Sequence, residues 1–132
     1  MYQFLNLFFF FFHTALVLFN SLGWIYRSTR KWNLITLLLT AFSWFVLGIW
    51  YGWGYCPFTD WHWQVRRHLG LYDQTNSYIH FLILKISGFN LPMQAVETGT
   101  VLVFVISLSL SIALNIRDLR KQSGRTKQVE VR

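Results

Sequence analysis

Three long apolar stretches without a charged side chain constrain this chain more than any other feature. Residues 1–26 carry no charge and include five consecutive phenylalanines at positions 8–12. Residues 32–59 and residues 98–116 form the second and third charge-free stretches. Each stretch is long enough to cross a bilayer as a helix, which takes about 20 apolar residues. The sequence therefore predicts spans at about residues 4–24, 34–54 and 98–116.

Composition leads to the same class. Hydrophobic residues make up 54% of the 132 residues and charged residues only 13%, whereas a soluble domain has about 25% charged residues. A soluble domain of this length could not bury so much apolar surface. We therefore expect an all-α integral membrane protein with one membrane domain at residues 1–116, and we exclude a soluble enzyme, a disordered protein and a disulfide scaffold. The first span lacks a basic segment before it, which predicts an uncleaved anchor.

The segment between the second and third spans, residues 55–97, predicts two short interfacial helices. One fits between Thr59 or Asp60 as N-cap and Gly70 beyond the C-terminus, and we expect it to lie flat on the membrane surface. The other is the apolar run at residues 78–84, which is about half a span long and is closed by Lys85 and Gly88. It suits a helix at the interface or dipping into the bundle better than a fourth crossing.

Basic residues predict the orientation. Nine of the 12 Lys and Arg residues lie in the first loop or after residue 116, and such residues accumulate on the cytoplasmic side. We expect the N-terminus and residues 55–97 outside, residues 117–132 as a disordered basic cytoplasmic tail, and the bacterial cytoplasmic (inner) membrane as the location. The lipid bilayer is then the partner of the basic charge. A nucleic-acid partner is not expected, because Gly124, Asp118 and Glu130 interrupt a basic face.

Small and polar residues indicate where helices touch inside a bilayer. Each predicted span carries a polar face, and we expect the three faces to meet in one bundle. The second span also carries a GxxxG pair, which serves packing within the chain or dimerisation. The predicted packing residues are Asn6, His13 and Asn20 in the first span, Thr36, Thr40, Ser43, Gly48 and Gly52 in the second, and Thr100, Ser107 and Ser111 in the third.

Chemistry, if the chain performs any, is expected at the intramembrane histidine and in the outer segment. An ionisable group in a span is a functional candidate by default; His13 is either a neutral imidazole bonded to Ser43 or Ser107, or a proton relay or cofactor ligand. Asp60 could pair with Arg66, or Arg66 and Arg67 could bind lipid phosphate. The candidate functional residues are His13, Cys56, Thr59, Asp60, His62 and Arg66.

A metal site is not expected. The outer segment contains Cys56, His62, His68 and His80, but their spacings of six, six and twelve differ from the tight pairs of structural zinc sites. Two histidines could hold a haem between helices, although the chain has no C-x-x-C-H attachment sequence. Asp60 and His62 are a fragment of a nucleophilic site without a matched nucleophile.

Two stretches of the sequence carry a family resemblance. The first is His-Thr-Ala-Leu-Val-Leu-Phe-Asn-Ser-Leu-Gly at residues 13–23. The second is Gly-Tyr-Cys-Pro-Phe-Thr at residues 54–59, followed by Arg66 and Gly70. The chain resembles a bacterial membrane family known as domain of unknown function 2784, in matching order over nearly its whole length. The resemblance carries over His13, Gly23, Cys56, Pro57, Thr59, Arg66 and Gly70. His62 and Trp63 stand where the family usually has Glu and Asn. Any role of that Glu carboxylate in the family is therefore not carried over to this chain. The family implies this architecture and no activity.

Two functions follow as expectations. The first is a non-enzymatic accessory protein or complex subunit that packs against a membrane protein partner or a second copy, without a cofactor. The alternative is a redox or ligand-binding protein that holds haem, quinone or lipid between His13 and the outer aromatic helix. A transporter is less consistent with the sequence, since three spans without charged residues on their polar faces do not make a pathway.

Overall fold

The computed structural model of the chain describes residues 1–72 and 77–132, and all regular elements in these residues are helices. Three of its helical segments are long and apolar enough to cross a membrane: Tyr2–Leu22, Arg30–Tyr51 and Met93–Glu130. The predicted all-α membrane fold is therefore confirmed. The elements in chain order are α1 (Tyr2–Leu22), α2 (Arg30–Phe42), the π-helical turn η1 (Ser43–Leu47), α3 (Gly48–Tyr51), α4 (Pro57–His68), α5 (Tyr78–Ser87) and α6 (Met93–Glu130).

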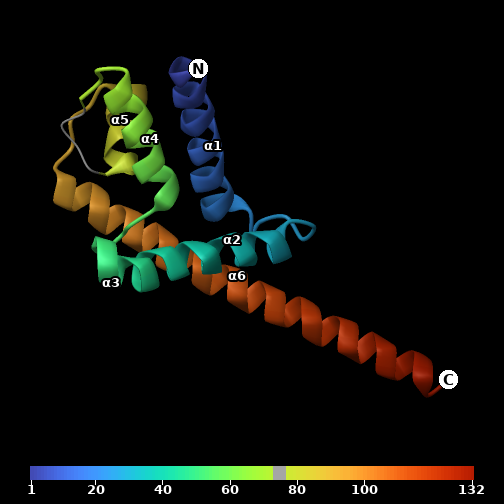
Figure 1. Ribbon diagram of the computed structural model, residues 1–132. Helices are drawn as coiled ribbons and strands as arrows, with labels where there is room; N and C mark the ends of the chain where they lie inside the picture. The colour runs from blue at the N-terminus through green and yellow to red at the C-terminus, as the bar shows by residue number, and fades with distance from the viewer. Residues whose placement is uncertain (73–76) are drawn as a thin grey trace.

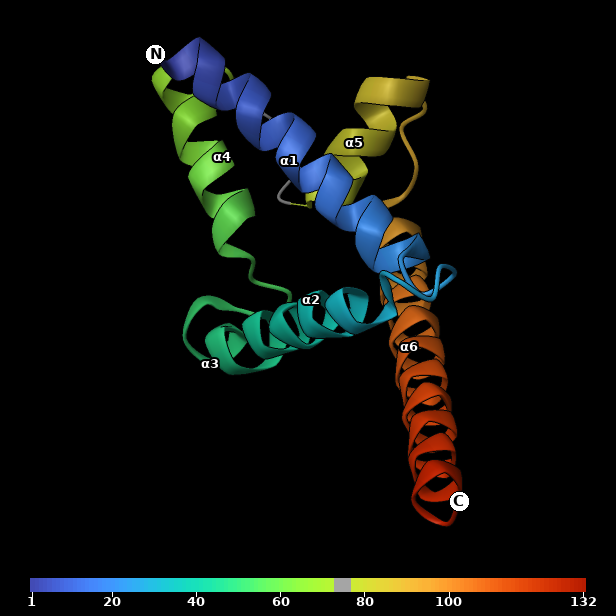
Figure 2. The ribbon, with the colours of Figure 1, turned by 90° about the vertical axis from the view of Figure 1, so that its right-hand side faces the viewer.

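The three long helices cross one another obliquely instead of forming a parallel bundle (Figures 1 and 2). The C-terminal end of α1, helix α2 and the middle of α6 meet where the three helices cross. There Asn20 Nδ2 donates to Thr40 Oγ1 at 3.0 Å, and Ser107 Oγ donates to the Ser21 carbonyl at 3.4 Å. Ser111 is fully buried at the same point. Polar side chains from all three long helices thus meet, but only where the helices cross.

Gly23 makes the crossing of α1 and α2 possible. The Asn33 side chain lies against it, and Asn33 Nδ2 donates to the Phe19 carbonyl at 2.6 Å. A Cβ atom at Gly23 would stand 2.6 Å from the Phe19 oxygen and 2.8 Å from Asn33 Nδ2, both inside van der Waals contact. Glycine at this position therefore lets a fully buried asparagine bond to the end of α1.

The GxxxG pair does not bring two helices together within the chain. Gly52 ends α3 with φ of 105°, and a Cβ there would meet nothing within 4 Å. A Cβ at Gly48 would make only ordinary contact, at 3.6 Å, with the backbone of Trp53. Of the two roles that the sequence leaves open for this pair, packing within the chain is not supported by these distances, and dimerisation stays a prediction. Gly48 begins α3 and Gly52 ends it. Just after this turn, the Tyr55 carbonyl accepts a hydrogen bond from Ser43 Oγ at 2.7 Å.

Helix α4 runs antiparallel along the N-terminal half of α1 (Figures 1 and 2). Its start lies near the middle of α1, where the rings of Phe12 and Phe58 are 5.1 Å apart, and its end lies near the start of α1, where Tyr2 stacks on His68 at 4.8 Å. The helix predicted to lie flat on the membrane surface is thus packed lengthwise against a span. It also begins earlier than predicted, because Pro57 occupies its first turn, where its missing N–H costs nothing.

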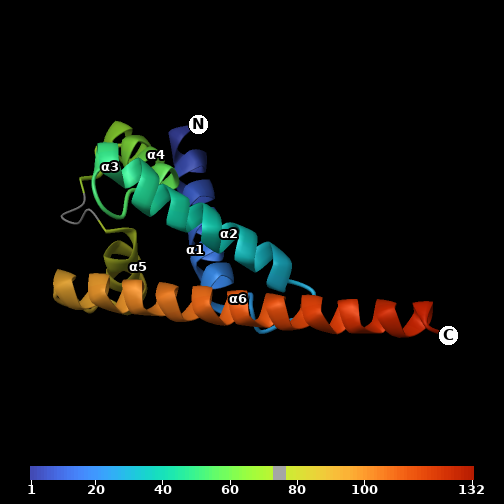
Figure 3. The same ribbon diagram turned by 90° about the horizontal axis from the view of Figure 1, so that it is seen from below.

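Helix α5 is the short apolar helix that the sequence predicts. Ser77 caps its N-terminus, and Gly88 follows its C-terminus in the left-handed conformation with φ of 74°. Ten residues extend only about 15 Å, which is half the bilayer core. The helix packs beside α6 (Figures 1 and 3) and inserts Tyr78 and Phe81 beneath α4. Residues 73–76 of the predicted outer segment lie outside the described residues.

Helix α6 continues to Glu130 as a straight rod, well beyond the predicted span (Figure 3). In the structure, residues 117–130 continue α6 as a helix, where the sequence predicts a disordered tail. This segment contains no proline and is rich in Arg, Lys and Gln, which have high helix propensity. The helix also places Arg117, Lys121 and Arg125 on one side at four-residue spacing, so the intervening Gly124 does not interrupt a basic stripe.

Candidate functional site

A buried polar cluster joins α1, α4 and α5, and it contains most of the candidate residues. We define it as Asn6, His13, Thr14, Thr59, His62, Arg66 and Tyr78. His13, His62, Arg66 and Tyr78 are each at most 8% exposed. So many polar groups among apolar helices are costly unless each finds a partner.

Asn6 is the acceptor that holds α4. Its Oδ1 lies 2.8 Å from His62 Nε2 and accepts a bond from Arg66 Nη1 at 3.3 Å. Because the amide oxygen can only accept, His62 carries its proton on Nε2 in this arrangement. His62 and Arg66 are one helical turn apart, so a single side chain on α1 receives both. His62 and Arg66 therefore lie on the same side of α4.

His13 lies in the second half of the cluster, between α4 and α5. Its ring stacks on Tyr78 with centroids 3.9 Å apart and planes inclined by 8°. Its Nδ1 lies 3.4 Å from Thr59 Oγ1. Ser43 and Ser107, the two partners predicted for His13, lie elsewhere, and each donates to a backbone carbonyl. That prediction fails because the three spans do not pack side by side at the level of His13.

Tyr78 ties α5 to α1. Its hydroxyl donates to the Phe10 carbonyl at 3.0 Å and lies 3.1 Å from Thr14 Oγ1. Thr14 itself donates to the same carbonyl, at 2.6 Å. Burial raises the pKa of the Tyr78 phenol, and the hydrogen bond to Thr14 acts in the opposite direction. The phenol is therefore neutral near pH 7 and acts as a hydrogen-bonding group.

Arg66 and Arg67 do not form a pair. Arg66 is buried, with its guanidinium carbon 4.7 Å from the centroid of the Phe81 ring, whereas Arg67 is exposed. Asp60 does not bond to Arg66 in the arrangement described here; its Oδ2 accepts from Gln64 Nε2 at 2.8 Å. The predicted Asp60–Arg66 ion pair is replaced by a bond within α4.

The residues considered for a metal site are dispersed. Among residues 1–72 and 77–132, no three His, Cys, Asp or Glu side chains are grouped as a metal site requires. His68 stacks on Tyr2, and His80 Nε2 lies 2.9 Å from the Leu91 carbonyl. Cys56 is a partly buried free thiol just before α4. Cys56, His68 and His80 therefore stand apart from His62.

Sequence reasoning missed Tyr78, Thr14, Asn33 and the ion pair between Arg30 and Asp118. Arg30 Nη1 lies 3.0 Å from Asp118 Oδ2 and joins the start of α2 to α6. One signal for Tyr78 was present, since a tyrosine at the start of an apolar run must find a partner for its hydroxyl when buried. The other contacts depend on how the helices cross, which periodicity does not reveal.

The model of one protein family, described as Protein of Unknown function (DUF2784), matches residues 3–116 of this chain. The match covers α1 through α5 and the apolar part of α6, and thus includes the whole polar cluster. Comparison with curated proteins and with solved structures finds no match. The chain therefore belongs to the DUF2784 family of proteins of unknown function.

Proposed function

We propose that this protein is a small non-enzymatic subunit or accessory protein of the bacterial cytoplasmic membrane, which offers its helix surfaces to a membrane protein partner or a second copy. One observation carries the proposal. The polar groups of the cluster bond to one another and to the Phe10 carbonyl across α1, α4 and α5, at distances of 2.6–3.4 Å. Such a cluster stabilises a fold and fixes one arrangement of its helices.

The outward surfaces suit this role. Only 6% of the most apolar window of α1 is buried within the chain, and the same holds for Arg30–Tyr51. Leu39, Ile49 and Ile106 are among the apolar side chains that are more than half exposed. Helices that cross obliquely leave long faces uncovered on both sides, and in a bilayer these faces are available to lipid or to other helices.

Photo-crosslinking tests the proposed partner. A photoactivatable residue at Leu39, Ile49 or Ile106 should crosslink the chain, in native membranes, to a defined membrane protein or to itself. Leu37 is fully buried and provides the matched control position, which should give no intermolecular product. Products that contain only lipid at all three exposed positions would contradict the proposal.

Purification at native expression level tests the ligand-binding alternative. We expect the tagged protein to elute with a stoichiometric protein partner or as an oligomer, without a visible chromophore. A Soret band, or a stoichiometric quinone found by mass spectrometry, would instead favour a redox protein with His13 or His62 at its site.

The proposed orientation has the N-terminus and residues 55–97 outside, following the distribution of basic residues. Single cysteines at Ser28, Asn90 and Ser123, in a background that carries Cys56→Ser, test it by labelling in intact cells. Asn90 should react with an impermeant reagent, whereas Ser28 and Ser123 should react only after permeabilisation. Labelling of Ser28 from the outside would reverse the orientation.

A further inference from the structure

Arg30 holds the first loop of the chain, residues 23–29, against α6. The loop lies beside this helix in two perpendicular views (Figures 2 and 3). The Arg30 guanidinium donates to the Trp24 carbonyl at 3.0 Å and to the Ile25 carbonyl at 3.5 Å. It also forms the ion pair with Asp118 at 3.0 Å. One side chain thus joins the loop to α6, and its bond to Asp118 bridges 88 positions of the sequence.

Two further arginines, Arg27 in the loop and Arg117 in α6, lie around the same carboxylate. The positive charges of both act on Asp118, although among the described residues only Arg30 bonds to it. In the same part of the chain, the side chains of Arg27 and Arg117 form no hydrogen bond or ion pair. Glu130, the next acidic residue along α6, is twelve residues or about 18 Å away. Asp118 therefore compensates only one of the three positive charges.

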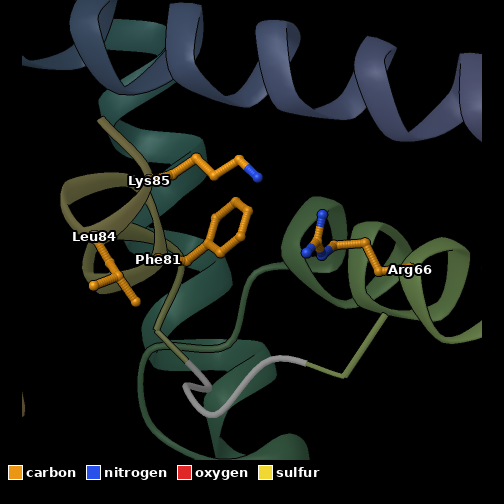
Figure 4. A pocket seen from close by; sticks show the side chains of 4 residues that line it. All are labelled: Arg66, Phe81, Leu84 and Lys85. Carbon is orange, nitrogen blue, oxygen red and sulfur yellow. The ribbon is translucent and has the colours of Figure 1, made fainter. Parts of the chain in front are cut away.

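The two arginines differ from Arg66. The Arg66 guanidinium lies beside the Phe81 ring (Figure 4), is buried and bonds to Asn6. Arg27 and Arg117 are instead exposed, so their side chains can turn toward an anion. A planar guanidinium donates to two phosphate oxygens at once, and two such groups can hold one phosphate from two sides.

Aromatic side chains indicate that this cluster lies at the surface of the bilayer. Tyr26 is 70% exposed in the loop, and Trp32 is 65% exposed in the first turn of α2. Tyrosine and tryptophan accumulate where a span enters the headgroup layer. Arg117 directly follows the span predicted at residues 98–116, so ends of all three predicted spans meet here. Cations beside exposed rings at this level suit a phospholipid, whose phosphate binds the cations while its acyl chains contact the rings.

We propose that Arg27 and Arg117 together bind the phosphate of an anionic phospholipid, with Tyr26 and Trp32 against the upper part of its acyl chains. Arg30 keeps the two segments of the site together through its bonds to the loop and to α6. The site is narrower than the general attraction between basic residues and lipid that the sequence predicts, since it assigns two side chains from separate segments. This lipid site goes beyond the proposed function and does not depend on it.

Lipid titration of the full chain in mild detergent, followed by native mass spectrometry, tests the site. The probes are phosphatidylglycerol, zwitterionic phosphatidylcholine and inorganic phosphate, and phosphatidylglycerol should bind most tightly. Arg27→Gln and Arg117→Gln should each weaken phosphatidylglycerol binding about fivefold, the effect expected of one basic residue near anionic lipid. Arg125→Gln removes an exposed charge from α6 eight residues farther along and is the matched control, which should leave the affinity unchanged.

Three results would overturn the site. An unchanged affinity in Arg27→Gln or Arg117→Gln would show that this arginine does not bind the lipid. An equal loss in Arg125→Gln would show a diffuse attraction to the whole basic helix. Inorganic phosphate that binds as tightly as phosphatidylglycerol would replace the lipid with a free phosphate. Because all three side chains are exposed, the variants should unfold at the temperature of the unchanged protein, which circular dichroism measures.

Discussion

His62 Nε2 and Asn6 Oδ1 lie 2.8 Å apart, although 56 residues separate them in the sequence. This contact places the polar helix α4 along the N-terminal half of α1. The same oxygen accepts from Arg66, so one asparagine on α1 bonds to two buried side chains on α4. The position of α4 on α1 depends in part on this asparagine.

Replacing Asn6 with alanine should destabilise the protein by about 2 kcal/mol, because two buried donors, His62 and the charged Arg66, each lose one hydrogen bond. The loss is measured as the lowering of the unfolding temperature in detergent. Gln3→Ala removes an amide from an exposed position of the same helix and is the matched control. Equal unfolding temperatures for the two variants would show that Asn6 does not hold α4 against α1.

Replacement by alanine should have opposite effects on the stability of the protein at Gly23 and at Gly124. Gly23→Ala forces a Cβ against Asn33 and the Phe19 carbonyl, and overpacking of this kind costs about 1–3 kcal/mol. Gly124→Ala meets nothing within 4 Å and should stabilise α6 by up to about 1 kcal/mol through helix propensity. Thermal unfolding of both variants measures the difference. A harmless Gly23→Ala would contradict the close approach of α1 and α2.

Alkaline pH should weaken the attachment of α5. The fold raises the pKa of the Tyr78 phenol above its ordinary value through burial, so the folded state binds this proton more tightly than the unfolded state. The contribution of the neutral Tyr78 phenol to the stability of the fold is therefore complete below about pH 10, the ordinary pKa of a tyrosine. It is lost as the pH rises through the higher pKa of the folded protein. Tyr78→Phe should lose part of this dependence in unfolding titrations, whereas Tyr72→Phe, at an 80% exposed position, should keep it.

The ion pair between Arg30 and Asp118 should contribute modestly. Its side chains are 13% and 19% exposed, and an ion pair at the surface contributes little, because water and salt screen the two charges. Asp118→Asn should lower the unfolding temperature slightly, and more at low salt than at high salt. Glu130→Asn changes an exposed charge on the same helix and is the control. A shift that is independent of salt would argue against an electrostatic origin.

The sequence predicted the spans because an apolar run of about 20 residues without charge matches, as a helix, the thickness of a bilayer core. It also predicted that Asn20, Thr40, Ser107 and Ser111 lie on polar helix faces, since periodicity determines a face. It could not predict how the helices cross. The Gly23–Asn33 contact depends on the turn after α1, and the two contacts of Asn6 depend on α4 folding back along the same helix. Both are contacts between helices, for which the spacing of residues within one helix gives no information.

Cysteine crosslinking at both ends of α4 tests most directly whether this helix packs lengthwise and antiparallel on α1 over the polar cluster. One variant carries cysteines at positions 12 and 58 and the other at positions 2 and 68, both in a Cys56→Ser background, and both are treated in native membranes with a short bifunctional thiol reagent. Because the parent rings of each pair are in contact, with centroids 5.1 Å and 4.8 Å apart, both pairs should crosslink within one chain. A helix lying flat across the membrane surface would crosslink at one end at most, and that result would contradict the lengthwise packing.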